Sequence, residues 1–265
     1  MTRTITAIIF VLIMTAGIIT SRYTYLPLFA LVTWLSLYEF YLMTNRHMVT
    51  LPGWIGIITG TGLFVLSFGI AGGYLDEKWT LTIIPPIGII FILELFNREN
   101  HKIHIISNTL TGLVYAAIPF SLLNFMVLTT NGYDYSILLG MIGLVWINDT
   151  AAFLFGSMFG RHRLFERISP RKTWEGCISG MAFTIIAGYF FTILPMNLSH
   201  NQWMIIAFIV AITATLGDLI ESMFKRSAEI KDSGNLFPGH GGVLDRFDSL
   251  IFTIPFVYAY LQLIQ

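Results

Sequence analysis

The sequence contains little charge and almost no cysteine. Only 11% of its 265 residues are Asp, Glu, Lys or Arg, whereas soluble domains carry about 25%. The single cysteine, Cys177, excludes an intrachain disulfide and any zinc site built from several cysteines. The formal net charge is zero, so no overall positive field favours nucleic acid as a partner. The scarcity of charge predicts an apolar environment for most of the chain.

What the sequence has in abundance is apolar residues. They make up 55% of the chain, and the mean hydropathy is +0.73. Apolar runs recur with a length of about 20 residues, which is what a helix needs to cross the hydrocarbon core. We therefore predict an all-α integral membrane protein with about nine transmembrane helices. The predicted spans are residues 4–21, 23–43, 53–74, 80–97, 104–129, 135–159, 175–195, 202–224 and 247–264.

We expect residues 1–265 to form a single polytopic membrane domain. Within it, residues 1–134 supply N-terminal helices, and residues 135–265 carry the catalytic motifs. The first apolar run has no small-residue cleavage site before Arg22, so we expect it to be a retained helix. Pro85 and Pro86 are expected to kink the fourth span.

Basic residues predict the orientation of the chain. All but two of the 15 Lys and Arg residues fall on the side that holds the N-terminus, the exceptions being Arg22 and Lys78. The positive-inside rule makes that side cytoplasmic, so the N-terminus is predicted inside and the C-terminus outside. Glu39, Glu94 and the deeper Asp149 lie toward the same side. Ionisable groups in membrane helices usually line a polar cavity, here one open to the cytoplasm, although Glu39 and Glu94 could equally be solvated acids at headgroup level.

The eighth predicted span ends in a polar face. In G-D-L-I-E-S-M-F-K-R, the residues Asp218, Glu221, Ser222 and Lys225 are spaced i, i+3, i+4 and i+7, which places them on one side of a helix. The carboxylates could bind a metal, and Lys225 could meet an anion. The alternative is an intrahelical ion pair between Glu221 and Lys225.

A second motif, G-H-G-G-V-L-D-R-F-D, opens the ninth span. Asp245 and Asp248 are spaced i, i+3 there, and glycines before a helix let backbone N–H groups approach a phosphate. Two carboxylates beside such a turn suit a magnesium–polyphosphate site, because hard cations take oxygen ligands. The alternatives are a helix N-terminus whose acids favour its dipole and, for His240, an ordinary loop histidine.

Two further segments carry polar residues. The basic loop R-H-R-L-F-E-R-I-S-P-R-K-T-W-E-G is explained by membrane topology and headgroup contact. Alternatively, Ser169, Lys172 and Thr173 hold a nucleotide or phosphate, with Thr173 capping the next helix. Asn148–Asp149 interrupts an apolar span, which favours a functional polar contact over simple packing. The nearby G-x-x-x-G at 156–160 indicates only close helix packing.

These residues carry a resemblance to a known family. The stretch 222–248 resembles the signature of phosphatidate cytidylyltransferases, also called CDP-diacylglycerol synthases. The matching positions are Ser222, Phe224, Lys225, Arg226, Lys231, Asp232, Gly234, Phe237, Pro238, His240, Gly241, Gly242, Val243, Asp245, Arg246, Phe247 and Asp248. N-D-T-A-A-F-L-F-G and S-P-R-K-T-W-E-G also resemble family segments, although Arg171 stands where the family commonly has Lys. The first half of the chain is similar only in hydrophobic layout.

The resemblance implies transfer of a cytidylyl group from CTP to phosphatidic acid, giving CDP-diacylglycerol and pyrophosphate in phospholipid biosynthesis. It implies a magnesium-dependent, all-helical membrane homodimer, and leaves open a second, monovalent cation. In the family, carboxylates matching Asp218, Asp245 and Asp248 are implicated in metal binding. We expect a bacterial inner-membrane protein whose active site faces the cytoplasm, with CTP, phosphatidic acid and membrane lipid as partners and no nucleic acid.

The hypothetical roles of the site residues follow from the motifs and the resemblance together. The residues assigned to catalysis are Asp218, Lys225, Arg226, Asp245, Arg246 and Asp248. The residues assigned to substrate binding are Ser169, Lys172, Thr173, Ser222, Lys231, Asp232, His240, Gly241, Gly242 and Asp149. The alternatives are a related membrane CTP transferase or kinase with another lipid acceptor, and a transporter. A transporter predicts ionisable groups near the midplane that are reachable from both sides.

Overall fold

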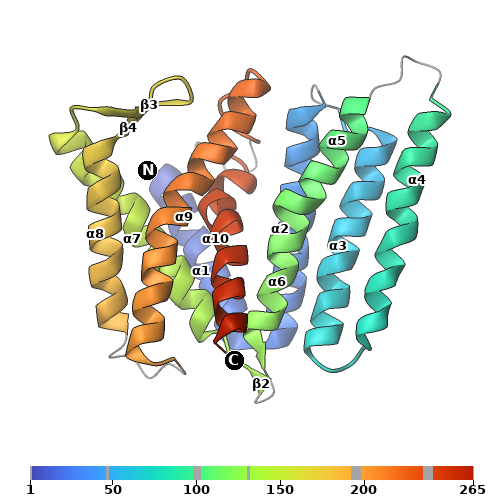
Figure 1. Cartoon of the computed structure of the whole chain (residues 1–265), viewed down its shortest axis with the longest axis horizontal. Coiled ribbons are helices and arrows are strands. Elements are labelled where there is room, and N and C mark those ends of the chain that lie inside the picture. Colours follow the sequence, from blue (N-terminus) through green and yellow to red (C-terminus); the bar gives the residue numbers. More distant parts are fainter. Residues whose placement is uncertain are drawn as a thin grey trace. The chain divides into compact units, whose positions relative to one another are not determined.

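The structure, a computed structural model, describes residues 2–45, 48–97, 103–129, 132–191, 198–234 and 241–264, with side chains from residue 8 onward. It consists of helices and two short antiparallel hairpins (Figure 1). The chain forms two compact units. The first comprises Met1–Asp134 and Ala228–Arg246, and the second comprises Tyr135–Ser227 and Phe247–Gln265.

The first unit contains most of the N-terminal helices. Serine and threonine start two of them, because Ser21 and Thr50 accept hydrogen bonds from backbone N–H groups of the first turn. The elements are α1 (Thr2–Thr20), α2 (Arg22–Thr44), α3 (Leu51–Ala71), the 3₁₀ helix η1 (Glu77–Ile83), α4 (Ile84–Leu95), α5 (Ile103–Gly112), the π-helix η2 (Leu113–Ala117), α6 (Ile118–Val127), β1 (Leu128–Thr129) and β2 (Gly132–Tyr133).

Aromatic packing and buried hydrogen bonds join the helices of the first unit. The ring centroids of Tyr25 and Phe29 lie 4.8 Å apart, and Phe64 adds a third ring to this core. Asn124 donates to the carbonyl of Phe64 at 2.8 Å and to Ser67 Oγ at 2.7 Å. These bonds tie α6 to α3 and satisfy polar groups that lipid could not solvate.

The second unit contains α7 (Ser136–Phe159), β3 (Arg163–Phe165), β4 (Ser169–Thr173), α8 (Trp174–Phe191), α9 (His200–Ser227) and most of α10 (Leu244–Leu263). Figure 1 shows α7, α8 and α9 packed side by side. A Cβ built on Gly156 of α7 would lie 3.3 Å from the Cα of Gly176 in α8. The close helix packing indicated by the G-x-x-x-G motif is therefore confirmed.

Asn148 acts as a polar tie within this second unit. Its Nδ2 donates to Thr215 Oγ1 of α9 at 3.3 Å, and its Oδ1 accepts from Thr184 Oγ1 of α8 at 3.3 Å. The Asn148 side chain is buried. Asn148 thus joins α7, α8 and α9. The neighbouring Asp149 instead interacts with Asp218 and Lys172.

The predicted fold class is confirmed, since the chain is an all-α integral membrane protein. Each of the nine predicted spans coincides with a helical segment of the described residues. Among these residues, six segments are long and apolar enough to cross a membrane, namely Arg22–Thr44, Leu51–Ala71, Glu77–Leu95, Ile103–Val127, Ser136–Phe159 and His200–Ser227. Large exposed apolar side chains such as Phe96 and Phe153 suit contact with hydrocarbon. The number of spans and their orientation stay predictions.

One local prediction was wrong, and a second is not tested. The basic segment between α7 and α8 is not a plain loop but a hairpin, in which Arg163 pairs with Thr173 and Phe165 with Ser169. Pro85 and Pro86 lie where the 3₁₀ helix passes into α4, and the expected kink stays a prediction. They occupy the first turn of α4, directly after η1, where a missing N–H removes no intrahelical hydrogen bond.

Candidate functional site

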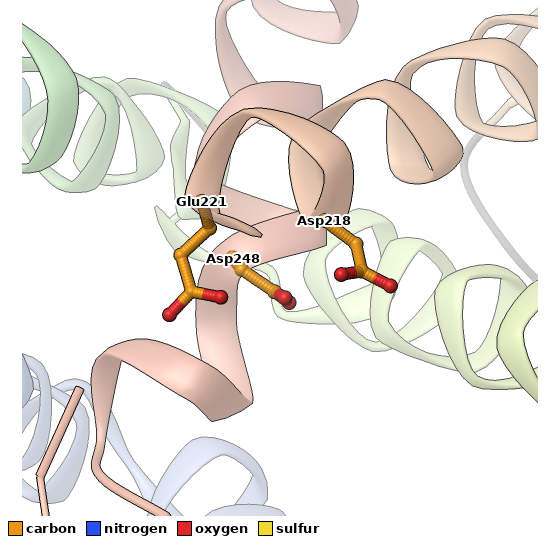
Figure 2. A group of neighbouring side chains, drawn as sticks. All are labelled: Asp218, Glu221 and Asp248. Carbon is orange, nitrogen blue, oxygen red and sulfur yellow. The ribbon is translucent and has the colours of Figure 1, made fainter. Parts of the chain in front are cut away.

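Three carboxylates gather where α9 meets α10. Asp218 and Glu221 come from consecutive turns of α9, and Asp248 comes from α10 (Figure 2). One oxygen from each lies within 4.8 Å of the others. Glu221 is fully buried, whereas the two aspartates are half-buried. The i, i+3 spacing on α9 thus does place two acids on one face, as the sequence predicts.

Gly217 is the reason that the two helices come so close at this point. A Cβ at this position would lie 2.8 Å from the carbonyl oxygen of Asp248 and 3.0 Å from the Cα of Ser249. Thr213 lies one turn earlier on α9, and its hydroxyl is 2.9 Å from the hydroxyl of Thr253 on α10. The absence of a side chain at Gly217 therefore lets backbone pack on backbone beside the cluster.

Replacing Gly217 by alanine should separate α9 from α10. Because the added methyl group meets backbone atoms that cannot rotate away, we expect a loss of about 1–3 kcal/mol in stability. Gly62→Ala is the matched control, since a Cβ there meets nothing within 4 Å and alanine favours helix. Thermal unfolding in detergent measures both variants. Equal midpoints for the two would contradict the close approach at Gly217.

Two lysines face the three carboxylates. Lys172 Nζ lies 2.5 Å from Asp218 Oδ2, and Lys225 forms an ion pair with Glu221 within α9. Ser222 Oγ donates to the other oxygen of Asp218 at 3.2 Å. The intrahelical pair that the sequence offered as an alternative is therefore present. It lies within the cluster, so the ion pair and a functional site do not exclude each other.

The cluster of Asp218, Glu221 and Asp248, counted with the charged residues that interact with it, carries an excess of negative charge. Asp248 interacts electrostatically with Asp218, Asp149 and Lys225, and Asp149 also interacts with Lys172. Counted over these described residues with Glu221, four carboxylates face two lysines, which leaves a formal charge of −2. Glu221 is fully buried, Asp218 and Asp248 are half-buried and Asp149 is exposed, and buried charges are usually paired or coordinate a metal. An excess of two negative charges suits one divalent cation.

The donor set fits a hard divalent cation rather than a softer metal. Among the described residues, the grouped ligands are all carboxylate oxygens, which suit Mg²⁺, Ca²⁺ and Mn²⁺. Mg²⁺ binds oxygen at about 2.1 Å, so two oxygens on one ion lie at most about 4.2 Å apart. The 4.8 Å spread of the cluster is slightly wider than this limit. A Mg²⁺ ion held by all three carboxylates would require these oxygens to approach one another by about 0.6 Å.

In the hairpin, Lys172 contacts the cluster, whereas the other residues make structural contacts with the helices. Lys172 of β4 reaches Asp218, as described above. Thr173 Oγ1 accepts from the backbone N–H of Gly176 at 3.2 Å, which confirms the predicted cap of α8. Arg226 Nε donates to the carbonyl of Ile168 at 3.3 Å and ties α9 to the hairpin, while Ser169 is half-buried in β4.

In the first unit, Asp245 closes the turn that precedes α10. Its Oδ2 accepts from the backbone N–H groups of Gly242 at 2.8 Å and Ser233 at 3.0 Å. Gly241 has φ +78°, and a Cβ there would overlap the Asp245 carboxylate, so only glycine fits. The turn therefore uses the N–H of Gly242 internally. For Asp245 and the N–H of Gly242, the structure therefore favours the alternative in which the acid stabilises the N-terminus of the helix.

Glu39 is one of two acids whose role the sequence left open. This buried carboxylate of α2 accepts from the N–H groups of Val243 at 2.9 Å and Leu244 at 2.8 Å. Glu94, the other unassigned acid, is buried in α4 and accepts from Asn97 Nδ2 at 3.3 Å. Of the other residues of this unit that were predicted for the site, Lys231, Asp232 and Arg246 are exposed. His240 lies outside the described residues.

Comparison with known proteins identifies the family to which the chain belongs. Residues 1–264 match the profile of the cytidylyltransferase family. A phosphatidate cytidylyltransferase of Staphylococcus saprophyticus is 31% identical over 260 residues. Relatives with the same name from Staphylococcus haemolyticus and Staphylococcus aureus (strain COL) are each 33% identical, over 257 and 260 residues. Each alignment covers 96% of this chain and 95% of the relative.

Proposed function

Since this chain belongs to the cytidylyltransferase family, and is thus a membrane-bound nucleotidyltransferase, we propose that it transfers the cytidylyl group of CTP to phosphatidic acid. The products are CDP-diacylglycerol and pyrophosphate. The names of the staphylococcal relatives support this choice of acceptor. The observation that carries the mechanism is the group of four carboxylates and two lysines around α9.

The reaction depends more on neutralising phosphate charge than on a general base. A phosphate monoester such as phosphatidate has its second pKa near 6, so its attacking oxygen is already ionised at neutral pH. This oxygen forms a bond to the α-phosphorus of CTP, and the bond from that phosphorus to the bridging oxygen of the β-phosphate breaks. The electron pair leaves with pyrophosphate. The obstacle is repulsion between two polyanions, which positioned cations relieve.

We assign metal binding to Asp218, Asp245 and Asp248. Asp218 and Asp248 lie together with Glu221 in the second unit, and Asp245 is included for its match to the family signature. A bound Mg²⁺ would supply neutralisation of phosphate charge during the transfer. The fully buried Glu221 holds Lys225 beside the cluster, so its own role is to place a cation.

The basic residues are proposed to bind the phosphates. Lys172 and Lys225 each hold one cluster carboxylate, so two ammonium groups lie beside the acids proposed to hold the metal. Arg226, Lys231 and Arg246 are exposed and can meet the outer phosphates of CTP. Lysine and arginine are suited to this because they offer donors and positive charge to phosphate oxygens.

We propose that the site faces the cytoplasm of a bacterium from its inner membrane, and that the enzyme is a homodimer. The basic loops favour this orientation. A site at the end of transmembrane helices lets phosphatidate enter sideways from the leaflet, while CTP arrives from water. Both substrates can therefore reach one cluster without either leaving its own phase.

A labelled-nucleotide assay on purified protein tests this function. With α-³²P-CTP, phosphatidate and Mg²⁺, we expect label in CDP-diacylglycerol and one pyrophosphate released for each product formed. Replacing phosphatidate by a polyprenyl phosphate or an ether-linked archaeal lipid phosphate should give no labelled product. Label in one of those lipids instead would assign the chain to a related transferase, and labelled CDP, the by-product of γ-phosphate transfer, would assign it to a kinase.

A further inference from the structure

A carboxylate from α2 holds the start of α10 in the first unit. Glu39 Oε1 accepts from the N–H of Val243, and Oε2 accepts from the N–H of Leu244. Ser233 Oγ lies 3.1 Å from Glu39 Oε2 and 3.0 Å from Asp245 Oδ2. The two acids thus share one serine hydroxyl, and together they engage three successive backbone N–H groups, of residues 242, 243 and 244.

These contacts satisfy groups that a helix cannot satisfy alone. The first N–H groups of a helix have no intrahelical partner. A negative charge placed there is favoured by the helix dipole, and hydrogen bonds to an ionised acceptor are the strong ones. Glu39 is only 5% exposed, so little water competes for its oxygens. A buried acid on a membrane helix is costly, and these donors compensate for that cost.

The turn is shaped around the Glu39 carboxylate. A Cβ on Gly234 would lie 2.6 Å from Glu39 Oε1. A Cβ on Gly242 would overlap the same carboxylate. Two glycines of the signature stretch therefore leave room for a side chain that is more than 190 positions away in the sequence. The shape of the turn and the presence of Glu39 depend on each other.

We propose that Glu39 is a positioning residue for cytidylyl transfer, a role that rests on the function proposed above. By binding the N–H groups of Val243 and Leu244, it fixes the turn that delivers α10, the helix that carries Asp245 and Asp248. Glu39 acts through this turn and not on the substrates. Without it, the signature residues stay in the chain, but their carboxylates are no longer held in place for a metal.

The variant Glu39→Gln tests the proposal, because glutamine keeps the size but loses the charge and one acceptor. Hydrogen–deuterium exchange in the absence of metal reports on the cap itself. We expect exchange of the Val243 and Leu244 amides to accelerate about tenfold or more, with the rest of the chain unchanged. The apparent affinity for Mn²⁺ should fall about tenfold, as for other residues that orient metal ligands. The half-activating Mg²⁺ concentration should rise by the same factor, with a smaller loss of rate at saturating Mg²⁺.

Glu94→Gln is the matched control, since Glu94 is also a buried acid at the end of a membrane helix. It should leave the exchange of Val243 and Leu244 and the Mn²⁺ affinity as in the wild type. Unchanged exchange of these amides in Glu39→Gln would contradict the capping role of Glu39. Faster exchange throughout the chain would show that Glu39 only stabilises the protein as a whole, and would overturn the positioning role. Faster local exchange with unchanged Mn²⁺ affinity would overturn the positioning role. Because exchange and Mn²⁺ binding do not require turnover, a wild-type protein that fails to use phosphatidate would contradict the proposed function alone.

Discussion

Replacing Asp248 by asparagine should lower the rate of cytidylyl transfer about a thousandfold, which corresponds to about 4 kcal/mol of transition-state stabilisation. Asparagine has nearly the same shape, so the contact between α9 and α10 is kept. What is lost is one of the negative charges that gather with Asp218 and Glu221. A site with less negative charge binds a divalent cation more weakly. The measurement is the initial rate with labelled CTP over a range of Mg²⁺ concentrations.

Asp76→Asn is the matched control for this substitution. Asp76 is an exposed carboxylate in the loop before η1, where it pairs with Lys78 at 2.9 Å. Hydrogen bonds from Lys78 lower the pKa of Asp76, so Asp76 is ionised at neutral pH. This control should keep the wild-type rate. An Asp248→Asn enzyme within tenfold of wild type at unchanged Mg²⁺ dependence would contradict the assignment of Asp248 as a metal ligand.

Replacing Lys225 by methionine should have the second largest effect, because it acts on both stability and catalysis. Lys225 is 11% exposed, and its partner Glu221 is fully buried. Removing one partner of a buried ion pair costs about 3–5 kcal/mol. We therefore expect a large drop in the thermal unfolding midpoint in detergent, together with loss of cytidylyl transfer.

A double variant separates these two effects. Glu221→Gln combined with Lys225→Met removes both charges of the pair, and replacing a buried pair as a whole is often neutral for stability. The double variant should regain most of the unfolding midpoint but should remain inactive, because no ammonium group is left at this position to meet the phosphates. Recovery of activity along with stability would show that Lys225 has a structural role only.

The membrane fold could be predicted because lipid leaves few choices. A helix that crosses the hydrocarbon core needs about 20 apolar residues, and the apolar runs of the sequence mark those helices directly. The polar face of α9 could be predicted for a similar reason. Asp218, Glu221 and Lys225 follow the helical repeat, so local periodicity is enough to place them together.

Contacts between distant segments left no such signal. The bonds from Glu39 to Val243 and Leu244 join positions 204 and 205 residues apart, and no periodic pattern links them. The glycines at 234 and 242 were visible in the sequence, but a glycine in a turn has many possible reasons. The close approach of α9 and α10 at Gly217 likewise depends on which helix packs there.

For some residues the sequence allowed two interpretations, because the same chemical group can stabilise the fold or bind a ligand. An acid at a helix N-terminus can favour the helix dipole or bind a metal. For Asp245 the structure places Oδ2 in the turn, and its use as a metal ligand remains a prediction. Lys172 was expected at a phosphate, and it contacts Asp218. Sequence distance gave no indication of this pair, since its members come from β4 and α9.

Direct binding of a divalent cation tests the central claim most closely. Mn²⁺ is a paramagnetic substitute for Mg²⁺ with the same preference for oxygen ligands, and its EPR signal distinguishes free from bound ion. Purified wild-type protein should bind Mn²⁺, and the double variant Asp218→Asn with Asp248→Asn should lose that binding while Asp76→Asn keeps it. Equal Mn²⁺ binding by the wild type and the double variant would contradict a metal site at the cluster of Asp218, Glu221 and Asp248.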